Sequence, residues 1–225
     1  MVGGSADLTP SNKTNFKGCV DFQHDTPAGR YLRFGVREHG MAAVCNGLAA
    51  HGGILPYCAT FLTFVGYALG AIRVTALSHF RVLYVMTHDS IGLGEDGPTH
   101  QPIETLASLR SMPNHLVIRP ADGNETSGAY AAALENGTRP TTISLSRQTL
   151  VHQANTSIEG VMKGAYTIHE PASGTAAVAV LVATGSEVQL CMAAAAALGN
   201  VKVVSMPCWE LFEEQSSAYQ QSVLG

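Results

Sequence analysis

Residues 81–101 read RVLYVMTHDSIGLGEDGPTHQ and join two stretches of opposite character. The first stretch, 81–87, is apolar and rich in β-branched and aromatic side chains, which predicts a buried strand. The second, 87–101, gathers two histidines, two aspartates and a glutamate around three glycines and a proline. A helical pattern resumes near Gln101. The polar loop is therefore predicted to follow the carboxyl end of a buried strand.

Short apolar runs alternate with longer helix-like segments along the rest of the chain. Further runs typical of buried strands are YLRFGV (31–36), LVIRP (116–120), TTISLSR (141–147), AAVAVLVATG (176–185) and VKVVSMP (201–207). Asp122 is placed to cap a helix, with Glu125 three residues later. Continuously apolar strands that alternate with helices predict an α/β fold with a mostly parallel sheet flanked by helices.

Residues 149–175 are polar and irregular, as is typical of a boundary between domains. We therefore expect a first domain over 1–150, a linker over 151–175 and a partial α/β domain over 176–225. The last holds only strand, helix and strand, which is too little for an independent α/β domain. The first begins at GGSADL without a preceding element. Both domains therefore look truncated, and a fragment of a longer chain is the expectation.

Composition restricts the classes of function. The 225 residues are 46% hydrophobic and 13% charged, which supports a sizeable core. The mean hydropathy of +0.13 favours subunit contacts, although a deeply buried parallel sheet would give the same value. A net charge of −4 argues against nucleic acid and acidic membranes as partners. Five widely spaced cysteines without a C-x-x-C pair indicate reduced thiols rather than zinc ligands or disulfides. No apolar run reaches the roughly 18 residues of a membrane span. A cytoplasmic protein is therefore expected.

Two patterns in the first half of the chain suggest a ligand site. Glu38, in FGVREHG, falls in the first turn of a predicted helix, where the helix dipole favours an acid. It also follows the carboxyl end of a strand, where parallel sheets bind ligands. Phe61, Phe64 and Tyr67 recur at a spacing of three and share one side of a helix or helical turn. Such a stripe is more often part of a hydrophobic core than the flat wall of a pocket for a planar ligand ring, and both interpretations stay open.

The polar loop allows three interpretations: a solvated loop without a task, a metal site, or a site for a polyol or phosphate. A metal site lacks a third and fourth ligand. In the last interpretation, Asp96 accepts hydrogen bonds from hydroxyls while His88 and His100 donate to anionic oxygens. Arg147, at the end of another strand, suits either phosphate recognition or a structural ion pair. Ser11 and Asn12 lie in a turn signalled by Pro10, which by itself indicates only a loop.

Taken in order, six segments resemble the pyrimidine-binding domain of transketolases, followed by the start of their carboxyl-terminal domain. They are GGSADLTPSN, FGVREHGM, FLTFVGYA, THDSIGLGEDGPTHQPIE, IRPADGNET and SLSRQ. The resemblance implies the thiamine diphosphate-binding pyrimidine-domain fold. It also implies transfer of a two-carbon ketol unit, from a ketose phosphate such as xylulose 5-phosphate to an aldose phosphate such as ribose 5-phosphate, in the pentose phosphate pathway.

The resemblance implies a cofactor site. Glu38 resembles the glutamate that hydrogen-bonds the ring nitrogen of the aminopyrimidine of thiamine diphosphate. Phe61, Phe64 and Tyr67 resemble the aromatic pocket around that ring, which favours the ligand-wall interpretation over core. Asp7 resembles a residue near the thiazolium part of the cofactor.

The resemblance also implies a sugar phosphate site. Ser11, His88 and Arg147 resemble the residues that hold the phosphate of the substrate. Asp96 and His100 resemble those that contact its hydroxyls near the reacting carbons. His100 is further expected to assist proton transfer.

A complete transketolase has an additional amino-terminal domain that holds the diphosphate through Mg²⁺ or Ca²⁺, using a Gly-Asp-Gly motif that ends in asparagine. No such motif occurs here, so the metal ligands are expected outside this chain. The resemblance implies a homodimer, with each cofactor between the amino-terminal domain of one subunit and the pyrimidine domain of the other. The isolated chain is therefore expected to hold half a site and to be inactive.

Two alternatives to a transketolase remain. One is the β-type subunit of a 2-oxo acid dehydrogenase, or the related deoxyxylulose phosphate synthase, which also place a glutamate before an aromatic pocket. These fit the segment from 87 to 104 and SLSRQ less well. The other is a non-catalytic module that keeps the fold as a partner or regulatory subunit.

Overall fold

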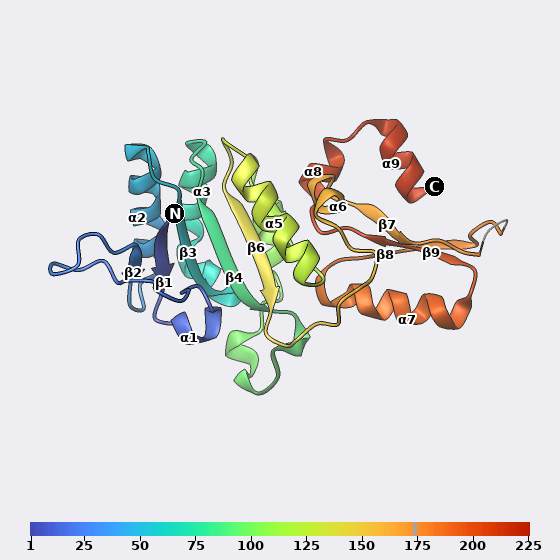
Figure 1. The fold of residues 1–225 in the computed structure, drawn as a ribbon, viewed down its shortest axis with the longest axis horizontal. Coiled ribbons are helices and arrows are strands. Elements are labelled where there is room, and N and C mark those ends of the chain that lie inside the picture. The colour runs from blue at the N-terminus through green and yellow to red at the C-terminus, as the bar shows by residue number, and fades with distance from the viewer. Residues whose placement is uncertain (173–174) are drawn as a thin grey trace. The chain divides into compact units, whose positions relative to one another are not determined.

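A computed structural model describes residues 1–172 and 175–225 (Figure 1). The chain divides into two compact units. The first consists of Met1–Leu116 and Asn136–Gln148, and the second of Val117–Glu135 and Thr149–Gly225. In the described ranges no helix has the length and apolarity that a membrane crossing requires. The five cysteines form no disulfide, as the sequence predicts.

The larger sheet has six strands in the order β2-β1-β3-β4-β6-β5. The strands are β1 (Val2–Ser5), β2 (Tyr31–Arg33), β3 (Pro56–Phe61), β4 (Leu83–Asp89), β5 (Leu116–Ile118) and β6 (Thr141–Ser146). Each pair from β2 across to β6 is parallel. All residues of β3 and β4 are buried, which explains why apolar side chains predominate in both strands. The predicted parallel α/β fold is confirmed.

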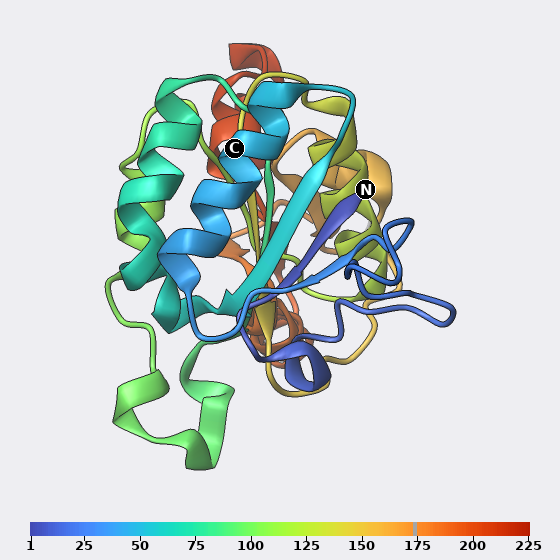
Figure 2. The ribbon, with the colours of Figure 1, turned by 90° about the vertical axis from the view of Figure 1, so that its left-hand side faces the viewer.

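Two helices, α2 (Glu38–His51) and α3 (Val65–Leu77), lie side by side against this sheet (Figure 2). The amide of Asn46 in α2 donates to the carbonyl of Ala71 in α3 at 2.9 Å. The hydroxyl of Thr75 lies 2.6 Å from that of Tyr84 in β4. These buried polar groups are therefore satisfied, and they fix α2, α3 and β4 relative to one another.

The sequence did not predict strands β1, β3 and β7 (Tyr166–His169). Strand β1 was missed because Gly3 and Gly4 have low strand propensity. It nevertheless lies between β2 and β3. A Cβ on Gly3 would stand 1.8 Å from the carbonyl oxygen of Tyr57, and one on Gly4 1.7 Å from that of Leu32. The neighbouring strands therefore require glycine at both positions, and close packing outweighs propensity here.

Short helices follow the carboxyl ends of three strands. They are α1 (Thr9–Asn12) after β1, η1 (Leu62–Phe64) after β3, and η2 (Ile91–Asp96) and η3 (Pro98–His100) after β4. The last two lie within the polar loop of residues 87–101. Helix α4 (Thr105–Arg110) begins four residues after Gln101, near which the sequence predicted a helical pattern.

The second unit contains a three-stranded sheet in the order β7-β9-β8. Its elements are α5 (Gly123–Glu135), α6 (Ile158–Met162), β7 (Tyr166–His169), β8 (Ala179–Ala183), η4 (Gly185–Glu187), α7 (Val188–Leu198), β9 (Val201–Ser205), α8 (Trp209–Glu213) and α9 (Ser217–Leu224). Strands β8 and β9 are parallel, whereas β7 and β9 are antiparallel. Elements α6 and β7 fall within 151–175, and the proposed domain boundaries stay a prediction.

The cap predicted for α5 is confirmed. The backbone N–H of Glu125 donates to Oδ1 of Asp122 at 3.0 Å, and the carboxylate of Glu125 accepts from the N–H of Ala121 at 2.7 Å. These reciprocal bonds satisfy two backbone donors at the start of the helix.

Candidate active site

The predicted site residues of the first unit follow the ends of separate strands. Asp7 follows β1, Glu38 follows β2, Phe61 ends β3, His88 is the penultimate residue of β4, and Arg147 follows β6. Because these strands are parallel, their carboxyl ends meet at one edge of the sheet, where open α/β sheets bind ligands. The fold therefore brings together segments that are far apart in the sequence.

A cavity of about 580 Å³ is found among these segments, and its volume suits a cofactor or small substrate. It is lined by Ala6, Asp7, Leu8, Val36, Glu38, Phe64, Tyr67 and His100. Five predicted site residues thus share one cavity: two carboxyl groups, two aromatic rings and an imidazole.

Glu38 is the first residue of α2 and is only 8% exposed. Within the residues that the structure describes, its carboxyl has neither a hydrogen bond nor an ion pair. The helix dipole favours an acid at this position by about 0.3–1 kcal/mol. A nearly buried carboxyl without a protein partner, facing a cavity, is available to hydrogen-bond a ligand.

The three predicted aromatic rings form a continuous stack. The centroids of Phe61 and Phe64 are 5.9 Å apart with an interplanar angle of 11°, and those of Phe64 and Tyr67 are 6.1 Å apart at 26°. The ring of His100 meets Phe64 edge-on at 5.2 Å. Phe61 belongs to β3 rather than to a helix, so the three residues span a strand end, η1 and α3. Tyr67 is 69% exposed, which contradicts a purely core role for it.

His88 packs face to face against Phe61, with ring centroids 3.7 Å apart and an interplanar angle of 19°. Its backbone has the left-handed φ of 64°, which is uncommon outside glycine. Burial lowers the pKa of His88 from its ordinary value of 6.5; Arg147 and His100 lower it further, while Asp96 opposes them. The imidazole is therefore neutral at pH 7.

A buried hydrogen-bond chain connects His88 to α1. The amide of Asn12 donates to the hydroxyl of Ser5 at 2.8 Å, and the hydroxyl of Thr87 donates to the amide oxygen of Asn12 at 2.7 Å. Nδ1 of His88 lies 2.9 Å from the same Thr87 hydroxyl. The chain fixes α1, and with it the exposed Ser11, beside the end of β4.

Arg147 is held by two acids of the polar loop. Its guanidinium lies 2.9 Å from the carboxylate of Glu95 and 3.4 Å from that of Asp96. Glu95 is 83% exposed, so this ion pair is a weak one that an incoming anion can replace. The other predicted site residues do not line the cavity of Glu38: they are Ser11, Phe61, His88, Asp96 and Arg147.

Sequence reasoning missed Asn12, Thr87 and Glu95 as parts of this site. Each is adjacent in sequence to a residue that it did identify, namely Ser11, His88 and Asp96. Their adjacency to predicted site residues was the signal in the sequence that could have identified them. The contacts themselves depend on the tertiary structure.

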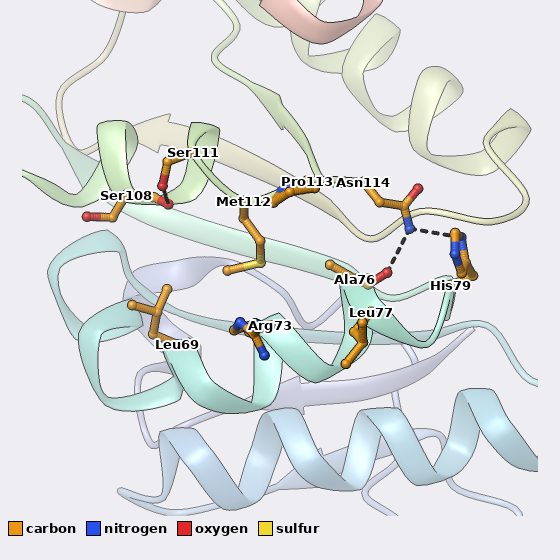
Figure 3. A pocket seen from close by; sticks show the side chains of 10 residues that line it. All are labelled: Leu69, Arg73, Ala76, Leu77, His79, Ser108, Ser111, Met112, Pro113 and Asn114. Carbon is orange, nitrogen blue, oxygen red and sulfur yellow. Dashed lines mark hydrogen bonds between the residues drawn. The ribbon is translucent and has the colours of Figure 1, made fainter.

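A second cavity, of about 570 Å³, lies between α3 and the segment from Ser108 to Asn114 (Figure 3). The side chain of Asn114 reaches across it to the carbonyl of Ala76 and to His79. Its lining includes none of the predicted site residues and no acid. The cavity of Glu38 is therefore the candidate active site. Among the described residues, no three His, Cys, Asp or Glu side chains are grouped so as to hold a metal ion.

Comparison with known proteins finds close relatives over the whole chain. It is 58% identical to the chloroplastic transketolase-1 of Arabidopsis thaliana, covering 100% of this chain and 31% of that protein. The transketolase of Leishmania mexicana superposes with a TM-score of 0.95 at 56% identity, over 99% of this chain and 33% of that one. A Pichia stipitis transketolase in complex with sedoheptulose 7-phosphate superposes with a TM-score of 0.94 at 52% identity, over 99% of this chain and 34% of that one.

A shorter relative is also similar. A split-gene transketolase described as an inactive β4 tetramer superposes with a TM-score of 0.75 at 26% identity, over 100% of this chain and 71% of that one. Against the first three relatives, by contrast, the chain spans about a third of their length.

Family models match both parts of the chain. Residues 1–153 match the transketolase pyrimidine-binding domain, and residues 164–225 match the transketolase-like C-terminal domain. The first match alone covers more than half of the 225 residues. The sequence motifs, the parallel fold and these matches agree, and the chain belongs to the transketolase family.

Proposed function

We propose that this chain supplies the part of a transketolase active site that faces the cofactor's pyrimidine ring and the sugar. The complete enzyme transfers a two-carbon ketol unit from a ketose phosphate such as xylulose 5-phosphate to an aldose phosphate such as ribose 5-phosphate, in the pentose phosphate pathway. The observation that carries this proposal is the single cavity shared by Glu38, Phe64, Tyr67 and His100. It combines an unpaired carboxyl with a wall of rings.

These residues fit the aminopyrimidine of thiamine diphosphate. A planar heterocycle stacks on aromatic faces, which Phe64 and Tyr67 offer to the cavity, while the buried Phe61 packs against Phe64. Glu38 has no other partner in the described residues and so can hold a proton between its carboxyl and a ring nitrogen. Asp7 lines the same cavity and is assigned to the thiazolium side. When bound, thiamine diphosphate supplies the nucleophilic carbon and the electron sink of the reaction.

The sugar phosphate is assigned to the neighbouring polar groups. Ser11, His88 and Arg147 hold the phosphate, because a hydroxyl, an imidazole and a guanidinium recognise an anion that accepts several hydrogen bonds. Asp96 and His100 contact the sugar hydroxyls, and His100 moves a proton near the reacting carbons. Support comes from the Pichia stipitis relative, whose complex contains sedoheptulose 7-phosphate.

The complete enzyme is proposed to be a homodimer that holds Mg²⁺ or Ca²⁺ through residues outside this chain. The 225-residue chain alone is proposed to be inactive, and the inactive tetramer of the split-gene relative supports this. We propose a boundary near residue 150 for the pyrimidine-binding domain, a linker to 175 and a partial carboxyl-terminal domain from 176. The compartment is proposed to be the cytoplasm. The Arabidopsis thaliana relative is chloroplastic, so imaging of a tagged protein decides between the two.

A chimera tests the activity. In the Leishmania mexicana relative, the matching third is replaced by this chain, and ketol transfer from xylulose 5-phosphate to ribose 5-phosphate is measured. We expect turnover by the chimera and none by the 225-residue chain alone. A folded chimera without transfer would favour a non-catalytic module. A chimera that consumes pyruvate instead of xylulose 5-phosphate would favour a 2-oxo acid dehydrogenase subunit or deoxyxylulose phosphate synthase.

A further inference from the structure

We propose that Asn12 and Thr87 are positioning residues that hold the neutral imidazole of His88 in one tautomer, with the proton on Nδ1 and Nε2 left as a hydrogen-bond acceptor. The two nitrogens of a neutral histidine have opposite roles, and a hydrogen bond at one of them decides which role the other has. The tautomer therefore determines what His88 offers to a ligand.

The assignment follows from the number of protons that Thr87 can donate. The hydroxyl of Thr87 has a single proton, which it donates to the amide oxygen of Asn12 at 2.7 Å. The same hydroxyl oxygen lies 2.9 Å from Nδ1 of His88. Since Thr87 has no second proton to give, its oxygen accepts, and Nδ1 must be the donor. In this orientation the Asn12 amide also donates to the hydroxyl oxygen of Ser5, which accepts from the N–H of Leu8 at 3.3 Å as well.

His88 stays neutral in this arrangement because of its surroundings. Its ring is buried and stacked on Phe61. The charged or titratable groups that act on it are Asp96, Arg147 and His100, of which only Asp96 favours the cation. A single proton is therefore shared between two nitrogens, and Thr87 decides its place.

His100 provides an internal contrast. It has the same neighbour, since the hydroxyl of Thr99 lies 2.9 Å from its Nδ1. No acceptor within the described ranges takes the proton of Thr99, so this hydroxyl can either donate to Nδ1 or accept from it. The pair is exposed, and neither tautomer of His100 is imposed. Thr99 is thus a matched control for Thr87.

A consequence follows for ligand binding, and it rests on the proposed function. If His88 holds the phosphate of a sugar, its Nε2 must first take up a proton, because a bare nitrogen cannot donate to a phosphate oxygen. Binding of the phosphorylated sugar is then accompanied by proton uptake at His88. A sugar hydroxyl, by contrast, can donate to Nε2 directly.

The tautomer can be measured without activity, by ¹⁵N NMR of the histidine rings in the 225-residue chain at pH 8. The resonance of His88 is assigned with His88→Gln. We expect protonated Nδ1 and bare Nε2 in the wild type. Thr87→Val removes the acceptor and should shift the population toward protonated Nε2, whereas Thr87→Ser should restore the wild-type signal. Thr99→Val should leave His88 unchanged.

Asn12→Asp is a second variant that tests the proposal even if Thr87→Val does not fold. A carboxylate can only accept, so Thr87 must donate to it, and the variant should show the wild-type tautomer. A wild-type spectrum with protonated Nε2 would overturn the proposal, as would a protonated Nδ1 that persists in folded Thr87→Val. Because no substrate is present, an inactive chimera leaves these results unaffected, and the two proposals fail separately.

Discussion

At the scale of single residues, Glu38 is costly to keep unless it is used. The residue is only 8% exposed, and no described side chain hydrogen-bonds its carboxyl to compensate for the hydration that burial removes. The helix dipole at the start of α2 offsets only part of this lost hydration. A ligand nitrogen that hydrogen-bonds the carboxyl from the adjacent cavity would replace the lost hydration.

Glu38→Gln in the chimera tests this directly. The amide keeps the size of the side chain but cannot exchange a proton, so we expect kcat to fall by about 10²–10⁴-fold, the range for general acid–base groups. The thermal midpoint should stay equal or rise, because a carboxyl with no described partner is removed. Initial rates and thermal unfolding check both outcomes. Glu135→Gln, an exposed acid at the end of α5, is the control. Unchanged turnover in Glu38→Gln would reject its catalytic role.

Glu95 is predicted to restrain the substrate site. Its carboxylate competes for Arg147, and exposed pairs of this kind are worth about 0.2–1 kcal/mol. Glu95→Gln should therefore lower KM for phosphorylated sugars by up to about fivefold with little change in kcat. Steady-state kinetics with phosphorylated and unphosphorylated ketoses measure this. An equal change for both substrates would show that Arg147 does not bind the phosphate. Arg147→Gln should raise KM for the phosphorylated sugars only.

At the scale of helices and strands, a feature could be predicted where a local sequence pattern determines it, and was missed where contacts between distant segments do. Strands in which apolar side chains predominate, such as β4 and β9, were predicted from the sequence within a few residues. Strand β1 was not, since Gly3 and Gly4 disguise it and only the proximity of β2 and β3 explains them. Candidate site residues could be proposed because chemistry-bearing side chains follow strand ends, and their roles stay a prediction. The bond between Asn12 and Thr87 spans 75 positions, and no local pattern announces such a contact.

Gly4→Ala tests the close approach in β1. The added Cβ would stand 1.7 Å from a backbone oxygen that cannot move without separating two strands. We expect the free energy of unfolding to fall by about 3 kcal/mol or more. Gly47→Ala in α2 is a control of opposite sign, because its Cβ meets no atom within 4 Å and alanine favours helix by about 0.5–1 kcal/mol. Urea unfolding measures both. Equal stability of the two variants would contradict the strand packing described for Gly4.

At the scale of the whole molecule, the chain is a low-charge protein with a few buried titratable groups. His115 is 2% exposed, its Nε2 lies 2.8 Å from the hydroxyl of Thr142, and its Nδ1 has no hydrogen-bond partner in the described residues. Burial lowers its pKa from 6.5 to about 3. The folded protein therefore keeps this ring neutral under conditions in which the unfolded chain protonates it.

Acid sensitivity should follow from His115. Between pH 6.5 and about 3 the unfolded state binds one more proton than the folded state, so stability is fully present above pH 6.5 and falls as the pH is lowered. At about 1.4 kcal/mol per pH unit, lowering the pH from 7.5 to 5 should cost about 2 kcal/mol through this residue. His115→Gln keeps an amide that can bond to Thr142 and should lose that part of the pH dependence. Urea unfolding at both pH values measures it, with the fully exposed His24→Gln as control. If His115→Gln and the wild type lose the same stability between these pH values, the buried ring does not stay neutral as proposed, and the acid sensitivity must come from other groups.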